Sequence, residues 1–366
     1  MFINLHIIQS VPASLLNRDD MNSAKGLTFG NVRRDRVSSQ SWKRAVRTEM
    51  RAAANDADCW ADRTTRLPSL VAKRLVDHHG IDSDIARAKV DALFAAMGLK
   101  LNDKGATTVS IYAATSAVTD LANFTATHLD DLGADTKTDK DLGKTAVHSL
   151  DVNGALDLAL FGRMLAELPV GGRIDGAAGF SHAIGVTPTT VEADFFTTVD
   201  DHAPEGEAVS TNLGTTDLTS PTLYRHIYLD IRRLVGNLDG NTEQAQNAAR
   251  ALIRHSITAL PDAKARSTAA HTLPDVVVAT IGGQNLSAAN AFADAITDTD
   301  VTRTSVAELL HQIDAHSKVT DFTTFALPLS RAAVSALDGT QALGDACVVA
   351  DDLDGLTDLL IQGCSW

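Results

Sequence analysis

The 366-residue sequence has only three cysteines, Cys59, Cys347 and Cys364, and no two of them form a CxxC pair. This scarcity argues against a disulfide framework and a structural zinc site, and it suits a reducing cytoplasm. No segment approaches the roughly 18–20 uninterrupted apolar residues of a membrane helix. The apolar N-terminus lacks a basic region and a small-residue cleavage site, which argues against a signal peptide. We therefore expect a cytoplasmic protein without a membrane partner, a metal ion or another cofactor.

Motifs for common enzymatic chemistry are also missing. The paired glycines at 171–172 and 282–283 match neither the dinucleotide-binding pattern nor the P-loop, and no Ser/His/Asp or Cys/His set stands out by spacing. The neighbours Asp19 and Asp20 could serve a metal-dependent nuclease. Adjacent carboxylates usually diverge, however, and Asp is common in turns, so the pattern favours a structural role for this pair.

Positive charge is concentrated in one part of an acidic chain. The formal net charge is −14, yet Arg18–Arg51 holds nine basic and four acidic residues. Within it, RRDRVSSQSWKRAVR (33–47) contains six Lys or Arg residues in fifteen. Charge alone leaves two interpretations open, a solvated helix face and a binding surface for a polyanion.

The periodicity of apolar residues predicts a mixed fold. Strands are expected at 2–9, 179–187, 222–231 and 275–282, and helices at 39–53 and 242–260. Their order is βαββαβ, the ferredoxin-like arrangement shared by RRM domains. VPASLLNRDDMNSAKGLTFGN (11–31) is predicted to be irregular, NLSAANAFADAIT (285–297) to add a helix, and the C-terminal region is weakly patterned.

The basic run leads into the N-terminus of the helix predicted to start near Ser39. Cations are disfavoured at that end of a helix unless an anion is present, and helix N-termini bind phosphates through free N–H groups. The apolar stripe of Trp42, Val46 and Met50 predicts that Trp42 anchors this helix in the core. The aromatic RNP1 motif of RNA-reading RRM sheets is absent, so RNA would bind through loops, the helix start and insertions.

Several segments resemble motifs of the CasC family, the repeated backbone subunit of the type I-E CRISPR Cascade complex. They follow the family's order: LLNRDDMN (15–22), KGLTFGNVRRDRVSSQSWKRAVR (25–47), FGRM (161–164), DGAAGFSHAIGVTPTTVEADFFTTVDD (175–201), LGTTDLTSPTLYR (213–225) and LPDVVVATIGGQNLSAANAF (273–292). Residues 55–150 and those beyond about 300 match poorly. Nothing is carried over to those two regions.

The resemblance implies an α+β fold with an RRM-like palm, a large helical fingers insertion and a β-hairpin thumb. The palm would comprise 1–54, 175–192 and 222–366, with fingers at 55–174 and the thumb at 193–221. It also implies a non-catalytic subunit whose copies form a helical filament along a guide RNA (crRNA), beside other Cascade subunits. The filament would present the guide's bases to target DNA in antiviral defence.

Matching motif positions imply two sets of RNA contacts. Guide-RNA phosphates would be held by Arg18, Lys25, Arg34, Ser38, Gln40, Lys43, Arg44 and Arg47. Apolar side chains would wedge against kinked bases, namely Met164, Phe196 and Leu213.

Two alternatives remain open. One is a metal-dependent endoribonuclease of a CRISPR effector complex, with Asp19, Asp20 and Asp35 as the acidic candidates near the basic run. The other is an enzyme that binds a phosphorylated metabolite. Asp35 places an acid inside the basic motif, and the sequence leaves its role unexplained.

Overall fold

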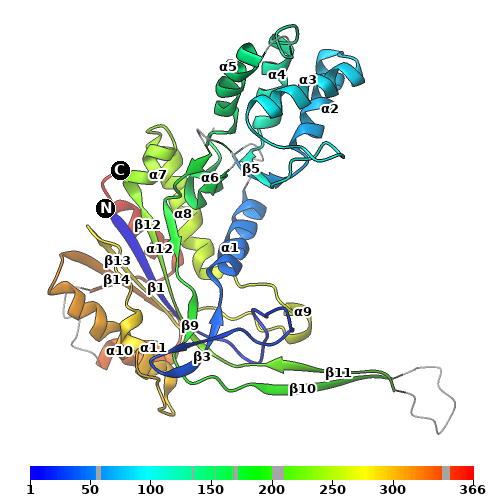
Figure 1. Cartoon of the computed structure of the whole chain (residues 1–366). Helices are drawn as coiled ribbons and strands as arrows, with labels where there is room; N and C mark the ends of the chain where they lie inside the picture. The colour runs from blue at the N-terminus through cyan, green and yellow to red at the C-terminus, as the bar shows by residue number, and fades with distance from the viewer. Residues whose placement is uncertain are drawn as a thin grey trace. The chain divides into compact units, whose positions relative to one another are not determined.

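The computed structural model describes residues 1–54, 59–133, 136–152, 154–166, 168, 172–199, 210–339 and 347–366. The chain divides into two compact units. Unit 1 comprises Met1–Met50, Gly179–Asp230 and Ala249–Ser365, and unit 2 comprises Arg51–Ala178, Ile231–Ala248 and Trp366. Helices and a large mixed sheet confirm the predicted α+β class (Figure 1).

The sheet of unit 1 is centred on β1 (Phe2–Ser10). This strand pairs antiparallel with β12 (Thr222–Asp230) on one side and with β13 (Val276–Gly282) on the other. Beyond β12 lies β9 (Ala183–Gly185), again antiparallel. The four strands expected from periodicity are therefore neighbours, in the order β13-β1-β12-β9.

Further strands extend this sheet at both edges. At one edge, β3 (Val32–Val37) pairs with β9, and β2 (Gly26–Phe29) pairs with β3. At the other edge lie β14 (Phe322–Pro328) and then β15 (Cys347–Val349). One more strand, β8 (Ala178–Phe180), pairs with β12 off this path. The sequence pattern predicts an irregular stretch where β2 and the following turn form, and it predicts no strand at β3. The weakly patterned C-terminal region supplies the other edge.

Helices cover both faces of the sheet. On one face, Trp42 of α1 (Ser39–Ala53) packs with Leu223 of β12, which confirms its predicted place in the core. Arg225 of β12, on the same face, has its guanidinium carbon 4.0 Å from the Trp42 ring centroid and donates to the Ser256 carbonyl of α8 (Thr242–Thr258). The face is thus closed by the two predicted helices.

The opposite face is closed by elements that the sequence pattern did not predict. Ile8, Tyr224 and Val278 of the sheet pack against α10 (Val301–Ser317) and α11 (Arg331–Gly339). The 3-10 helix η2 (Ala289–Phe292) completes this layer, so the longer helix predicted at 285–297 is wrong. The physical reason is that the carbonyls of Phe292 and Ala293 accept hydrogen bonds from Arg34 rather than from a following helical turn.

A β-hairpin formed by β10 (Glu192–Val199) and β11 (Ser210–Leu218) extends away from the sheet (Figure 1). Lys264 donates to the Thr216 hydroxyl at 2.7 Å, and a bridge between Ser14 and Thr219 ties the chain just after β11 to the rest of unit 1. Residues 200–209 of the predicted thumb lie outside the described residues.

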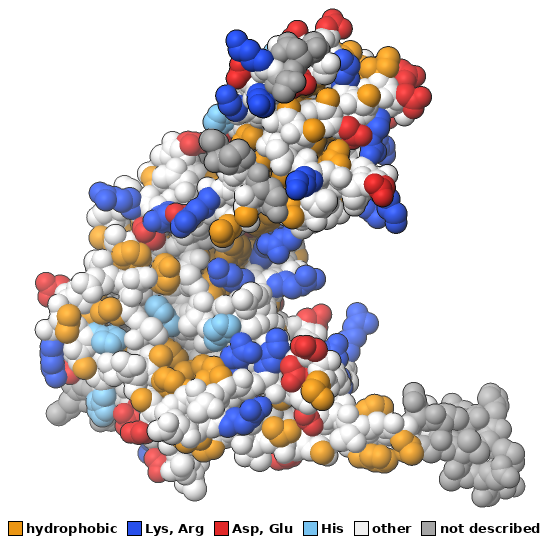
Figure 2. Space-filling view, in the orientation of Figure 1, with side chains coloured by type: hydrophobic (Ala, Val, Ile, Leu, Met, Phe, Trp, Pro, Cys, Tyr) orange, Lys and Arg blue, Asp and Glu red, His pale blue; other side chains and the backbone are white. Residues whose placement is uncertain are grey.

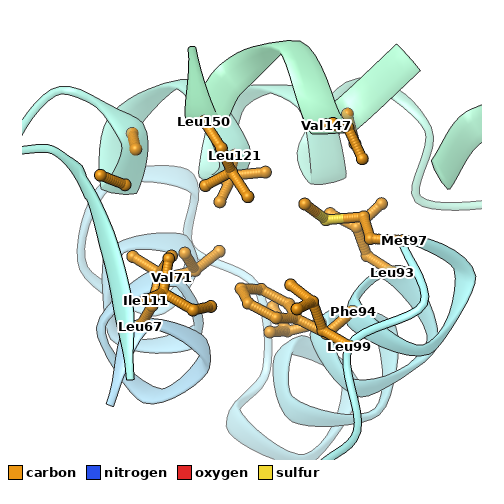
Figure 3. Packing of buried hydrophobic residues seen from close by; sticks show 14 of the residues in the cluster. Leu67, Val71, Leu93, Phe94, Met97, Leu99, Ile111, Leu121, Val147 and Leu150 are labelled. Carbon is orange, nitrogen blue, oxygen red and sulfur yellow. The ribbon is translucent and has the colours of Figure 1, made fainter. Parts of the chain in front are cut away.

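Unit 2 is mainly helical and has its own apolar core. Val71, Leu93, Phe94 and Leu121 come from three helices and meet in the core that Figure 3 shows. Its helices include α2 (Leu67–His79), α3 (Ser83–Ala96), α4 (Ala117–Thr127), α5 (Thr136–Ala146), η1 (Val147–Leu150), α6 (Leu156–Phe161) and α7 (Ile231–Asn237). Its strands form the pairs β4 (Ala61–Thr64) with β5 (Ile111–Ala114) and β6 (Arg163–Met164) with β7 (Arg173–Ile174).

Two short helices complete unit 1, α9 (Ala265–Thr268) and α12 (Leu353–Gln362). Across the described residues of both units, none of the helices has the length and apolar character needed to cross a membrane. The division into palm, fingers and thumb stays a prediction.

Candidate nucleic-acid interface

The start of α1 is held by contacts from distant parts of unit 1. The Ser38 carbonyl accepts from the amides of Ser41 and Trp42, so Ser38 is the N-cap residue directly before α1. The Ser38 amide donates to Asn17 Oδ1 at 3.0 Å, and the Ser39 amide donates to His182 Nδ1 at 3.2 Å. These contacts fix the N-terminus of a helix whose first turn carries no acidic residue.

The turn around Arg18 lies beside this helix start. Asp19 Oδ1 accepts from the amides of Met21 and Ser23, at 3.0 and 2.9 Å, and the side chain of Arg18 donates to Asn22. Asp19 therefore serves as the turn-forming carboxylate that the sequence favours. Arg18 remains exposed on the surface of the turn.

Backbone hydrogen bonds attach the end of this turn to β3. The Lys25 amide donates to the Asn17 carbonyl at 3.0 Å, and the Lys25 carbonyl accepts from the Arg36 amide at 2.9 Å. Lys25 and Arg36 are both partly exposed, so two cations lie on adjoining backbone segments. Figure 2 shows Lys and Arg side chains gathered over α1 and the nearby strands.

Arg34 occupies a different place from the one that the motif comparison implies. Its side chain is fully buried, and its guanidinium donates to the carbonyls of Gly185, Val186, Phe292 and Ala293. Burial lowers its pKa, while the nearby carboxylate of Asp294 acts in the opposite direction. Arg34 has no exposed surface, and its two terminal nitrogens link the end of β9 to the end of η2. It therefore offers nothing to a phosphate.

Asp35, whose role the sequence leaves open, is also buried. Burial raises the pKa of its carboxyl, and a hydrogen bond from the Thr219 side chain opposes that rise. Thr219 directly follows β11, so the acid inside the basic motif joins β3 to the base of the hairpin. Asp35 therefore has a structural role between β3 and the hairpin.

The basic residues of α1 differ in exposure. Lys43 is half-buried, with its ammonium nitrogen 5.7 Å from the Phe180 ring centroid, and burial lowers its pKa. Arg44 is exposed and lines an open cleft of about 400 Å³ between α1 and residues 260–271. Arg47 is half-buried, and Gln40 is exposed in the first turn. Lys43, Arg44 and Gln40 therefore retain surface that a ligand can reach.

His182 joins this group, although the sequence does not single it out. Its Nδ1 accepts from the Ser39 amide at 3.2 Å and lies 3.5 Å from Arg36 Nη1. Burial and the charges of Arg36 and Lys25 lower the pKa of His182, which places all three side chains in one electrostatic cluster. We call Lys25, Arg36, His182 and the Ser39 amide the helix-start cluster.

The predicted apolar wedge residues are exposed, but the two on the hairpin do not share a face. Phe196 pairs with Gly214 and Leu213 with Thr197, so Phe196 and Leu213 point to opposite faces of the hairpin. Phe195, 64% exposed and missed by the motif comparison, shares the face of Leu213. Met164 is 82% exposed and belongs to unit 2.

Gly214 allows the Phe196 ring to lie across the hairpin. A Cβ built on Gly214 would meet the Phe196 ring at 2.3 Å, closer than any real contact of that kind. The missing side chain therefore determines where the ring of Phe196 can lie. This cross-strand pairing is not apparent from either strand's sequence alone.

The sequence does contain a signal for the hairpin that positions β3. Gly30 and Asn31 link β2 to β3 and both have positive φ, 58° and 60°. Two such residues in a two-residue loop define the type I′ turn that favours tight hairpins. A Cβ on Gly30 would also lie 1.5 Å from the Ala293 carbonyl oxygen, so this position requires glycine.

Fold and surface together define an α+β protein with a covered sheet and a localised basic surface at a helix start. The chain belongs to the CT1975-like protein family, whose model matches residues 3–353. The CasC resemblance drawn from the sequence motifs is thereby confirmed as membership of this CRISPR-associated family. No curated protein matches the chain.

Two solved structures are similar along their whole length. A chain of a "CRISPR RNA-guided surveillance complex, pre-nicking" is 31% identical, with a TM-score of 0.84, and 99% of this chain and 100% of that chain are covered. A chain of a "CRISPR RNA-guided surveillance complex" is 28% identical, with a TM-score of 0.74 and complete coverage of both chains. The chain thus has the fold of a subunit of CRISPR surveillance complexes.

Proposed function

We propose that this protein is a non-catalytic backbone subunit of a type I-E CRISPR surveillance complex, in the cytoplasm, which holds a guide RNA by its phosphates. Several copies line up along one guide, beside other subunits, and leave its bases available to target DNA. The observation that carries the proposal is the helix-start cluster, which gathers cations and a hydrogen-bonded helix N-terminus on a protein of net charge −14. The two similar chains come from RNA-guided complexes, which supports RNA as the polyanion.

The strand order supports an RRM-like palm within this proposal. Along the chain the four strands come in the order β1, β9, β12 and β13, and in the sheet they lie in the order β13-β1-β12-β9, with all neighbours antiparallel. This is the arrangement of a βαββαβ unit in which each helix connects two strands that have one other strand between them. Helices pack on both faces of these strands. RNA therefore contacts the margin of the sheet, where β3 leads into α1, rather than a sheet face.

Phosphate contacts are assigned to side chains with accessible surface. The cations are Arg18, Lys25, Arg36, Lys43, Arg44 and Arg47, with Gln40 as a polar contact in the first helical turn. Ser38 contributes by setting the helix start through its backbone. Arg34 is left out because it is buried. Met164, Phe196 and Leu213 are the proposed apolar contacts to bases, and Phe195 joins them because it is exposed beside Leu213.

The non-catalytic part of the proposal is supported by the positions of the acidic candidates. Asp19 is engaged with two backbone amides, and Asp35 is buried under the hairpin base. Within the described residues, no three His, Cys, Asp or Glu side chains are grouped as metal ligands. Incubation of the purified complex with labelled complementary RNA and Mg²⁺ is expected to leave the RNA intact. Regularly spaced cuts that disappear in Asp19→Ala or Asp20→Ala would instead establish the endoribonuclease.

RNA that co-purifies with the protein tests the binding role. The protein, expressed together with its native CRISPR array, is expected to retain short RNAs of uniform length with common, repeat-derived ends. A matched preparation of an Arg44→Ala, Lys43→Ala double variant should retain less of the same RNA. Purification of both proteins without RNA, or with RNA of random length and sequence, would contradict the proposal.

A further inference from the structure

His182 has a tautomer that its surroundings determine. Its Nδ1 lies within hydrogen-bonding distance of the Ser39 amide and of Arg36 Nη1, and both of these groups can only donate. Nδ1 therefore acts as the acceptor and carries no hydrogen. In the neutral ring the hydrogen then resides on Nε2, for which the described residues provide no hydrogen-bond partner.

The same surroundings keep the ring neutral. The charged groups facing it are Arg36 from β3 and Lys25 from the segment before β2, while α1 contributes the positive end of its backbone. Protonation of Nδ1 would break the contact to the Ser39 amide and add a third positive charge to this cluster. Burial acts in the same direction and lowers the pKa of His182 further.

We infer that His182 is an RNA-positioning residue that donates Nε2–H to a phosphate oxygen of the guide as a neutral imidazole. The inference rests on the proposed function and deepens it. The Ser39 amide already donates to His182, so this amide does not meet the phosphate directly. The exposed ring instead extends the hydrogen-bond donation of the helix start outward, with Arg36 and Lys25 supplying the surrounding positive charge.

A neutral donor has a thermodynamic signature that separates it from a cation. A cation that neutralises a phosphate releases condensed counterions, and for single strands the logarithmic salt slope changes by about 0.7 per contact. A neutral hydrogen bond releases none. Loss of the His182 contact should therefore lower affinity at every salt concentration while leaving the slope unchanged.

The test measures the affinity of the full chain for a single-stranded RNA oligonucleotide by fluorescence anisotropy at several salt concentrations. In His182→Asn, the amide oxygen can replace Nδ1 as acceptor for Ser39, while the donor at the Nε2 position is lost. We expect about fivefold to tenfold weaker binding, as for one lost hydrogen bond, with the wild-type salt slope. His182→Gln places an amide near the Nε2 position, and we expect it to bind more tightly than His182→Asn.

Arg44→Ala is the matched control, because it removes a proposed cationic contact and should reduce the slope. Wild-type affinity in His182→Asn, equal losses in the Asn and Gln variants, or a reduced slope would each overturn the inference while leaving the proposed function standing. Failure of the wild-type protein to bind RNA would overturn the proposed function itself. A thermal unfolding midpoint equal to that of the wild type establishes that each variant is folded.

Discussion

Acid should destabilise unit 1 through two histidines in the centre of its sheet. The rings of His6 and His226 stack with centroids 5.0 Å apart, and both side chains are buried. His226 Nε2 lies 3.1 Å from Asn4 Oδ1, and His6 Nδ1 lies 3.0 Å from the Tyr224 hydroxyl. Burial, with a smaller effect of His316, lowers the pKa of His226 to about 4. Burial and the neighbouring His226 lower the pKa of His6 as well.

The sign of the effect follows from the unfolded state, in which a histidine titrates near 6.5. Between about pH 6.5 and pH 4 the unfolded chain binds more protons than the folded chain, so the free energy of unfolding falls as the pH falls. For His226 the difference between about 4 and 6.5 corresponds to about 3 kcal/mol, reached near pH 4. His6 contributes with the same sign.

Hydrogen exchange of the β1 amides measures this loss within unit 1 alone. Opening free energies should decrease from pH 7 to pH 4 in the wild type, after correction for the intrinsic exchange rate. His226→Gln keeps an amide that can donate to Asn4 but cannot titrate, and it serves as the control for the many carboxylates that protonate in the same range. A pH profile of the same steepness in both proteins would refute the reasoning.

Three further predictions concern single side chains. Arg34→Met should lower the free energy of unfolding by about 3 kcal/mol, because four carbonyls lose a charged donor. The matched control Arg33→Met, at an exposed position, should change it by less than about 0.5 kcal/mol. A reduced salt slope of RNA binding in a stably folded Arg34 variant would contradict the buried role. Arg44→Ala should reduce the salt slope of RNA binding by about 0.7 for any RNA sequence, and an unchanged slope would remove it from the contacts. Gly214→Val should displace the Phe196 ring and weaken assembly on RNA without changing the thermal unfolding of unit 1, and wild-type assembly would show that the ring's position is unimportant.

The central strands and helices of unit 1 could be predicted because their periodicity is strong. β1 alternates in sequence from Ile3 to Ile7, α8 directly follows the capping residue Asn241, and β13 is apolar apart from Thr280. Each pattern arises because the apolar side chains of the element are buried between the sheet and its helices. The order of these elements then left few arrangements of the strands open.

The edge elements could not be predicted in the same way. β2 and β3 are short, and β3 carries three arginines, a composition untypical of a strand. Its conformation depends on the Gly30–Asn31 turn and on pairing with β9, which is distant in sequence. Because β3 is stabilised by pairing with a strand some 150 residues away, its own sequence gives little indication that it is a strand.

The positions of the candidate site residues could be predicted from the sequence only in part. The basic run does lead into the N-terminus of α1, as predicted. Arg34, however, is buried, although a charged residue in such a run is expected at the surface. Four carbonyls from two distant segments make that burial possible, and no local pattern reveals them. His182 was missed for the related reason that its partners, Ser39 and Arg36, come from another part of the chain.

The most direct test of the account is the mass of the complexes formed on RNAs of increasing length, measured by sedimentation at fixed salt. If copies of the chain line up along the guide backbone, the number bound should increase in equal steps with RNA length and be the same for unrelated sequences. A single copy bound at every length, or a number that follows base sequence instead of length, would contradict the central claim.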